Sequence, residues 1–275
     1  MEQQSIYPLT VNWHFINRCN MSCKYCFVPK QSEELSLSQS LSILSKLRNK
    51  FTKINFVGGE PTLSPYLPLL VKEAKALGFV VSIITNGYEL IYNEDHYKSL
   101  YKSLDIIGLS VDSLNHFTNC TIGRCIHNKS IPLKDYQNLC NTIKENNISL
   151  KINTVVSKLN KDEDFSSFYE ATNPDKIKIF QVLKPNLILK HTYDDMLISK
   201  EEFYSFIARH KRFDKKLCIE DNNMMLNSYY MLDSKGCFID NSTGRFSKSL
   251  LHSTLEDALK DIYLDEEKYI ARNIK

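Results

Sequence analysis

Short runs of β-branched and other apolar residues alternate along the chain with longer stretches in which apolar residues recur every three or four positions. This alternation is typical of βα units that build a parallel sheet. The pattern predicts six strands, at Thr10–Asn17, Lys53–Val57, Val80–Asn86, Ile106–Asp112, Ser149–Val156 and Lys176–Leu183. It also predicts helices at Leu37–Asn49, Ser64–Ala76, Asn93–Ser103, Leu133–Glu145, Lys161–Ala171 and Ser199–Lys211.

Six successive βα units predict an α/β fold, a partial (βα)6 TIM-type barrel over residues 1–212. In such barrels the active site lies at the carboxyl ends of the strands. Residues 213–275 lose the βα rhythm and predict a C-terminal extension with a Thr243-Gly244 turn and a last helix at Leu255–Tyr263.

Alternation within each strand separates two faces, because residues i and i+2 point to the same side. One face is mostly apolar, as the helix-covered outside of a barrel must be. The other face is polar on four strands, and we expect it to point inward: it carries Asn12, His14, Lys53, Asn55, Lys151, Asn153 and Lys178. Ammonium groups in a dry lumen repel one another and lose hydration unless an anion neutralises them, as a polyphosphate would. The alternative for Lys53 and Lys178 is that each lies at a strand end and extends to water.

Composition places the chain among single globular enzymes: 275 residues, 43% hydrophobic, 24% charged and a net charge of +3. This charge gives no indication of nucleic-acid binding. No apolar run reaches the roughly 18 residues of a membrane helix, so we expect a cytoplasmic protein with no membrane partner. Five cysteines are scattered and are expected to be reduced thiols: Cys120, Cys125, Cys140, Cys218 and Cys237.

The other three cysteines, Cys19, Cys23 and Cys26, form a CxxxCxxC motif directly after the first predicted strand. Three thiolates can hold three irons of a [4Fe–4S] cluster and leave the fourth iron open to another ligand. Structural zinc is the alternative, but it requires four protein ligands and the chain has no second cysteine pair of the usual spacing. A disulfide framework is less consistent with a chain long enough to bury a full core.

The cysteine motif is followed one strand later by Gly58-Gly59-Glu60-Pro61, and together they resemble the radical SAM superfamily. Further segments are similar to the viperin family, among them Ser110-Val-Asp112-Ser, Ile122-Gly-Arg124 and Ser247-Lys248-Ser. Viperins are radical SAM enzymes that convert a nucleoside triphosphate to its 3′-deoxy-3′,4′-didehydro form, a chain terminator in antiviral defence. Animal members use CTP, and prokaryotic relatives use CTP, UTP or GTP.

The resemblance implies a role for each matching residue. It implies Cys19, Cys23 and Cys26 as cluster ligands, and Gly58, Gly59, Glu60, Asn86, Ser110 and Arg124 around S-adenosylmethionine (SAM). Around the triphosphate and ribose it implies Asn12, His14, Lys53, Lys151, Asn153, Lys178 and Lys248. Tyr229 aligns with a tyrosine that relays a hydrogen atom, and residues 213–275 are expected to close the nucleotide site. A flavodoxin- or ferredoxin-type electron donor is implied, and we expect a monomer.

Two other functions stay open at this point. The first is a radical SAM enzyme for another substrate, such as GTP cyclisation or peptide modification. Those relatives usually carry extra C-terminal cysteines for further clusters, and this chain offers only Cys218 and Cys237 there. The second is a protein without catalytic activity that binds a metal or a nucleotide.

Overall fold

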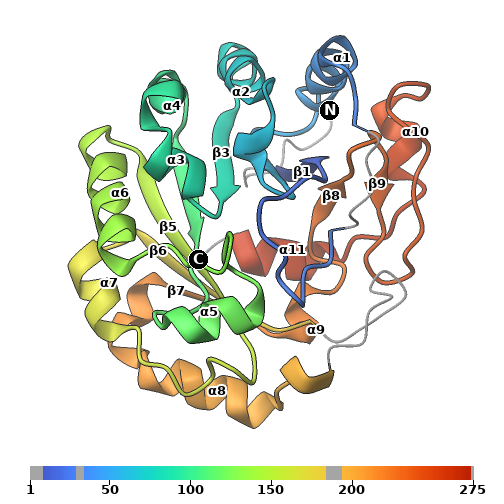
Figure 1. Cartoon of the computed structure of the whole chain (residues 1–275). Helices are drawn as coiled ribbons and strands as arrows, with labels where there is room; N and C mark the ends of the chain where they lie inside the picture. The colour runs from blue at the N-terminus through green and yellow to red at the C-terminus, as the bar shows by residue number, and fades with distance from the viewer. Residues whose placement is uncertain (1–8, 29–33, 184–193, 274–275) are drawn as a thin grey trace.

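A single nine-stranded sheet forms the centre of the computed structural model, which describes residues 9–28, 34–183 and 194–273. The strand order is β7-β6-β5-β4-β3-β2-β1-β8-β9. The six predicted strands are all present and run parallel: β1 (Thr10–Ile16), β2 (Lys53–Gly58), β3 (Val80–Thr85), β4 (Ile106–Ser110), β5 (Ser149–Val156) and β6 (Lys176–Gln181). The predicted α/β fold is confirmed, and Figure 1 shows the helices as an outer arc around the curved sheet.

Within the described ranges, eight helices follow these strands: α1 (Leu37–Leu47), α2 (Leu67–Ala76), α3 (Tyr88–Tyr92), α4 (Glu94–Tyr101), α5 (His116–Ile122), α6 (Leu133–Glu145), α7 (Ser166–Thr172) and α8 (Lys200–Arg209). Ser36 and Ser199 close capping boxes at the starts of α1 and α8. Helix α6 matches its prediction, whereas α7 starts five residues later than predicted, at Ser166 rather than Lys161. Helices α3 and α5 were not predicted, because five and seven residues are too few to show a helical period. Short 3-10 turns lie at Pro61–Leu63 (η1), Asp194–Met196 (η2) and Lys211–Lys216 (η3).

The C-terminal residues continue the sheet rather than leaving it, which corrects the prediction that the βα rhythm ends near residue 213. Strand β7 (Leu217–Glu220) pairs parallel with β6, and β8 (Tyr230–Leu232) pairs parallel with β1 at the opposite edge. Strand β9 (Phe238–Ile239) pairs antiparallel with β8. These strands have two to four residues, too few for alternation to reveal them.

As far as residue 273, where the description ends, this part of the chain has three helices: α9 (Asn222–Met225), α10 (Leu255–Leu259) and α11 (Glu266–Asn273). The predicted last helix Leu255–Tyr263 is wrong in length, and α11 was missed. Gly244 adopts a positive φ of 70° and its N–H bonds to the carbonyl of Asp240, so the predicted turn is present.

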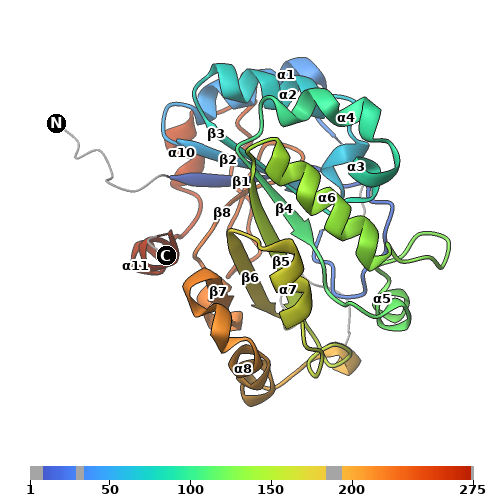
Figure 2. The same ribbon diagram turned by 90° about the vertical axis from the view of Figure 1, so that its left-hand side faces the viewer.

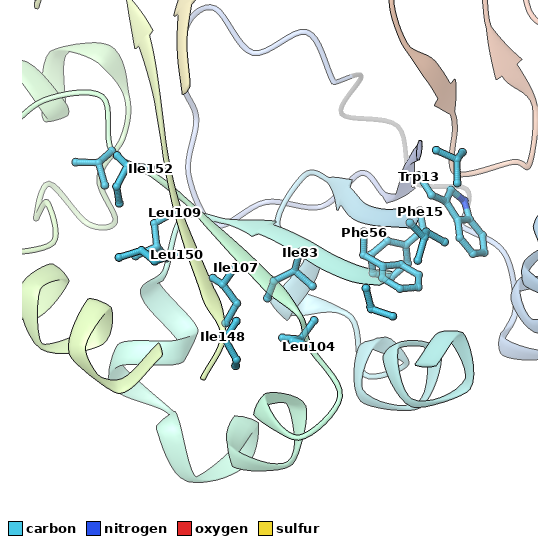
Figure 3. Close-up of a cluster of buried hydrophobic side chains, with 14 of the residues drawn as sticks. Trp13, Phe15, Phe56, Ile83, Leu104, Ile107, Leu109, Ile148, Leu150 and Ile152 are labelled. Atoms are coloured by element: carbon cyan, nitrogen blue, oxygen red, sulfur yellow. The ribbon is translucent and has the colours of Figure 1, made fainter. Parts of the chain in front are cut away.

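The apolar strand faces pack against the helices and form the core. Trp13, Phe15 and Phe56 form one aromatic cluster, with Trp13 and Phe56 ring centroids 6.0 Å apart (Figure 3). Ile152 and Ile179 on later strands are likewise fully buried. Burial of each such side chain contributes about 1.5–3 kcal/mol. Because this face is fixed toward the helices, seen outside the strands in Figure 2, the polar face must point into the barrel.

In the residue ranges that the structure covers, we find no helix with the length and apolar character required to cross a bilayer.

Candidate active site

A cavity of about 520 Å³ opens at the carboxyl ends of the strands, within the size range of small-molecule sites. A smaller hollow of about 120 Å³ lies among residues nearer the amino ends, and both are lined by Asn12, Asn55, Lys151, Lys178 and Tyr229. Most residues implied by the family resemblance line the larger cavity: Asn12, His14, Cys19, Cys23, Cys26, Gly58, Gly59, Glu60, Asn86, Ser110, Arg124, Lys151, Asn153, Lys178 and Tyr229. Their individual roles stay predictions.

Two predicted residues lie elsewhere. Lys53 lines the smaller hollow. Lys248 is exposed and lines neither hollow, and its backbone N–H donates to Asp261 Oδ2 at 3.0 Å. The structure therefore groups the substrate set predicted from alternation and leaves Lys248, which was implied only by resemblance, outside that group.

The loop that carries the cysteines is fastened to the end of β2 by backbone hydrogen bonds. Gly59 N–H donates to Ile16 O at 2.7 Å, and Glu60 N–H donates to Arg18 O at 2.8 Å. A Cβ atom at Gly58 would lie 2.1 Å from Ile16 O, and one at Gly59 would lie 2.1 Å from Arg18 O. The glycine pair is thus required by the close approach of this loop.

A second attachment holds the same loop from the side of α5. Ser22 N–H donates to Gly123 O at 3.0 Å, and Lys24 N–H donates to Ile122 O at 2.9 Å. Gly123 ends α5 with a φ of 93°, and a Cβ there would lie 2.2 Å from Ser22 O. The loop is therefore clamped on two sides by residues far away in the sequence.

The three cysteines of this loop fit a cluster better than a single metal ion. They lie within electrostatic reach of one another, and partial burial raises the pKa of Cys23 to about 12. Among the described residues, no group of three His, Cys, Asp or Glu side chains is close enough to hold one ion. Zinc needs four ligands at about 2.0–2.3 Å, whereas an iron–sulfur cube is wide enough to reach three separated thiolates.

Glu60 is buried and its carboxylate is engaged by four donors. Oε1 accepts from Thr62 N–H at 3.1 Å and from the hydroxyls of Thr62 and Thr85 at 2.7 and 2.6 Å. Oε2 accepts from Asn86 N–H at 2.7 Å, and the Asn86 side chain donates to Asn20 of the cysteine loop at 2.7 Å. A carboxylate has about four acceptor positions. Glu60 and Asn86 therefore tie β2, β3 and the cysteine loop together.

Arg124 is held by a buried carboxylate that the sequence did not single out. Its guanidinium forms an ion pair with Asp112, which also accepts from the Tyr25 phenol at 2.6 Å and from Val155 N–H at 2.8 Å. Arg124 Nη1 also donates to Ser110 O at 3.5 Å. Burial disfavours the guanidinium charge, but Asp112 and its neighbours keep the pKa of Arg124 well above its ordinary value. Arg124 thus presents a fixed positive charge beside the cysteine loop.

Four lysines converge on the smaller hollow: Lys53, Lys151, Lys176 and Lys178. Burial, and then the positive charges of Lys178, Lys53 and Lys176, hold the pKa of Lys151 well below its ordinary value. Gly108 on the neighbouring strand leaves room for this side chain, since a Cβ there would lie 2.9 Å from Lys151 Cε. Four ammonium groups this close together would attract an anion. Lys176 was missed by the sequence argument although it shares a face with Lys178.

Asparagine and histidine side chains lie between the lysines and the cysteines. Asn55 Nδ2 donates to Asn12 Oδ1 at 2.8 Å, while Asn55 Oδ1 and Asn153 Oδ1 are buried acceptors that have no hydrogen-bond partner among the residues the structure describes. Burial lowers the pKa of His14 to about 4, so the imidazole is neutral at physiological pH. Buried acceptors of this kind are usually satisfied, so these two amides fit a ligand that donates hydrogen bonds, as ribose hydroxyls do.

Comparison with known proteins agrees with this geometry. Residues 13–171 match the model of the radical SAM superfamily. The S-adenosylmethionine-dependent nucleotide dehydratase of Flammeovirga pacifica is 37% identical over 96% of this chain and 93% of its own length. This chain belongs to the S-adenosylmethionine-dependent nucleotide dehydratases. The S-adenosylmethionine-dependent nucleotide dehydratase RSAD2 of Siniperca chuatsi is 32% identical over 99% of this chain and 80% of its own length.

The fold of this nucleotide dehydratase is shared with more distant radical SAM enzymes. Native anSMEcpe with bound AdoMet and Kp18Cys peptide superposes with a TM-score of 0.69 over 97% of this chain and 83% of that chain, at 14% identity. Membership of the superfamily implies a [4Fe–4S] cluster and SAM as cofactors. The predicted viperin-family relationship, enzyme class and cofactors are confirmed.

Proposed function

We propose that the substrate is a nucleoside triphosphate, CTP in preference to UTP or GTP, and that the product is its 3′-deoxy-3′,4′-didehydro analogue. Such a product acts as a chain terminator in antiviral defence. The observation that carries this proposal is the smaller hollow, which is lined by Lys53, Lys151, Lys176 and Lys178. It lies next to the larger cavity, which the three cysteines line. Phosphates neutralise such a lysine group, and the ribose then faces the cysteines.

The residues around the cysteine loop serve the cofactors. Cys19, Cys23 and Cys26 would hold the cluster, and Arg124 would pair with the methionyl carboxylate of SAM. The cluster and SAM, when bound, supply hydrogen-atom removal from an unactivated carbon. Glu60 fixes the strand ends through its four hydrogen bonds, and its Oε2, which accepts from Asn86 N–H, keeps a second lone pair that would accept from the ammonium group of SAM.

The residues of the lumen hold and orient the substrate. Lys151 faces the triphosphate, and a phosphate anion favours its ammonium form, which burial and the neighbouring lysines disfavour in the ligand-free protein. Asn55 and Asn153 accept hydrogen bonds from the ribose hydroxyls through their two unpartnered oxygens. His14 is neutral and can donate or accept without adding charge.

Residues 213–275 close the nucleotide site in this proposal. Met225, Leu226, Tyr229, Met231 and Asn241 from this part of the chain line the larger cavity. Together with Asn222, which also lines this cavity, they supply an apolar wall with two amides, which suits the flat faces and the hydrogen-bonding edge of a nucleobase. A reductant of the flavodoxin or ferredoxin type completes the system, acting on a monomeric, cytoplasmic enzyme.

The experiment is anaerobic incubation of the reconstituted enzyme with SAM, dithionite and each of the four ribonucleoside triphosphates, followed by mass spectrometry. We expect one triphosphate, CTP, to lose the elements of water while 5′-deoxyadenosine accumulates. Omitting SAM is the control. Cleavage of SAM with no change in any triphosphate would assign the enzyme to another substrate class.

A further inference from the structure

Glu220 contacts two cavity residues, Lys178 and Tyr229, which also contact each other. Its carboxylate lies 2.7 Å from Lys178 Nζ and accepts a hydrogen bond from the Tyr229 phenol. Lys178 Nζ also donates to the Tyr229 oxygen at 2.9 Å and lies 5.1 Å from the centroid of that ring. The three side chains come from β7, β6 and the residue before β8, so they join both ends of the sheet.

Burying the ion pair between Glu220 and Lys178 costs folding free energy, so stability does not explain it. Its side chain is 1% exposed, and that of Lys178 is 13% exposed. Removing a carboxylate and an ammonium from water costs several kcal/mol per ion, and a well-packed apolar pair often stabilises a fold as well or better. Leu217 and Cys218, its neighbours on β7, are buried residues of that kind. The pair therefore calls for a role beyond packing.

Its place in the cavity points to that role. Lys178 and Tyr229 line both the smaller hollow and the larger cavity, so they lie where the phosphates of a bound nucleotide would meet its ribose. Lys178 is also one of the cations that surround Lys151. A carboxylate behind it limits the movement of the ammonium group, while the phenol hydrogen is committed to the same carboxylate.

We propose that Glu220 is a positioning residue, which acts through Lys178 and Tyr229 to orient both side chains at the boundary between phosphate and ribose. This inference rests on the proposed function, because it assigns the boundary to a nucleoside triphosphate. Glu220 does not bind the anion. Its negative charge opposes anion binding, and its contribution is to the geometry of turnover.

The test is the reconstituted Glu220→Gln enzyme, since glutamine keeps the shape and removes the charge. We expect kcat for the triphosphate to fall roughly tenfold to a hundredfold, as small misplacements of reacting groups do. Inorganic tripolyphosphate, measured by calorimetry, should bind with unchanged affinity or about threefold to tenfold more tightly, because one nearby negative charge is gone. A misfolded variant would lose both turnover and tripolyphosphate binding.

Two further variants keep the test decisive. Glu220→Asp retains the charge and should recover part of the lost kcat. Glu202→Gln is the matched control, because Glu202 pairs with Lys161 at 2.5 Å but lines neither hollow, and its turnover should equal that of the wild type.

The outcomes separate this inference from the proposed function. Wild-type turnover in Glu220→Gln, or a joint loss of turnover and tripolyphosphate affinity, overturns the positioning role. If the wild type converts no triphosphate, the proposed function fails. The tripolyphosphate measurement then still decides the inference, since weaker binding by Glu220→Gln contradicts it.

Discussion

Arg124 and Asp112 form an ion pair in which only 11% and 1% of the two side chains are exposed. Asp112→Asn should lower the free energy of unfolding by about 3–5 kcal/mol, because it leaves a buried guanidinium without its counter-charge. SAM affinity should also fall, since Arg124 is no longer fixed. Denaturant titration and equilibrium dialysis measure the two effects. Asp257→Asn, which breaks an exposed pair with Lys260, should lower the free energy of unfolding much less, because solvent screens that pair. An equal loss of unfolding free energy in the two variants would show that burial of the Arg124–Asp112 pair adds nothing to its importance.

Gly58→Ala should displace the cysteine loop. The new Cβ would meet Ile16 O at 2.1 Å, so the backbone must move and iron bound per chain after anaerobic reconstitution should drop sharply. Gly78→Ala is the matched control: Gly78 also has a positive φ, of 83°, but a Cβ there meets only the Arg48 side chain, at 3.6 Å. That variant should lose about 1–3 kcal/mol of stability from backbone strain and retain its iron. Full iron content in Gly58→Ala would show that the loop does not depend on this approach.

Cys23→Ala should abolish the cluster and all formation of 5′-deoxyadenosine, because two thiolates leave one more iron without a protein ligand. The brown colour, its bleaching by dithionite and the product assay are the measurements. Cys237→Ala, which changes a partly buried cysteine outside the cavity lining, should behave as the wild type. Wild-type rates of SAM cleavage in Cys23→Ala cannot be reconciled with the assigned ligands.

Lys151→Met should stabilise the ligand-free protein and weaken triphosphate binding. A buried charge-assisted contact contributes about 1.5–3 kcal/mol, so affinity should fall by roughly one to two orders of magnitude in calorimetry. If affinity is unchanged, Lys151 does not contact the phosphates.

The same variant should also change how stability depends on pH. Folding lowers the pKa of Lys151 well below its ordinary 10.5, so between the two values the unfolded chain binds more protons. The stability of the ligand-free wild type should therefore rise with pH through this window. Lys151→Met should lack that contribution, and chemical denaturation at several pH values tests this. Parallel pH profiles for the two proteins would show that Lys151 titrates normally in the fold.

A nucleoside triphosphate should raise the melting temperature more than the matching nucleoside does. A ligand at about 100 times its dissociation constant adds about 2.7 kcal/mol, which corresponds to a shift of several degrees in a chain of this size. Base and ribose are common to both ligands, so the difference isolates the phosphates. Differential scanning calorimetry at matched concentrations measures it, and equal shifts would remove the lysines from the proposed site.

Strand alternation predicted much of the cavity wall, because a period of two fixes which side chains share a face. Asn12, Lys53, Asn55, Lys151 and Asn153 all line one of the two hollows. Alternation succeeds here since the opposite faces are apolar and cannot exchange places with the polar ones.

The missed parts depend on contacts between distant segments. Glu220 ends a four-residue strand, and its importance arises only from its contacts with Lys178 and Tyr229. Asp112 looks like any polar residue after a strand until the fold brings Arg124 and Tyr25 to it. Neither spacing nor composition carries that information.

The placement of β7 and β8 at opposite edges of the sheet has a consequence for biosynthesis. A nascent chain that has emerged only as far as β6 has six parallel strands whose outer two, β1 and β6, are both uncovered. Uncovered edges are sites of aggregation and of wrong pairing. Because β7 pairs with β6 and β8 pairs with β1, the chain must leave the ribosome as far as β7 before the first edge is protected, and as far as β8 before both edges are protected.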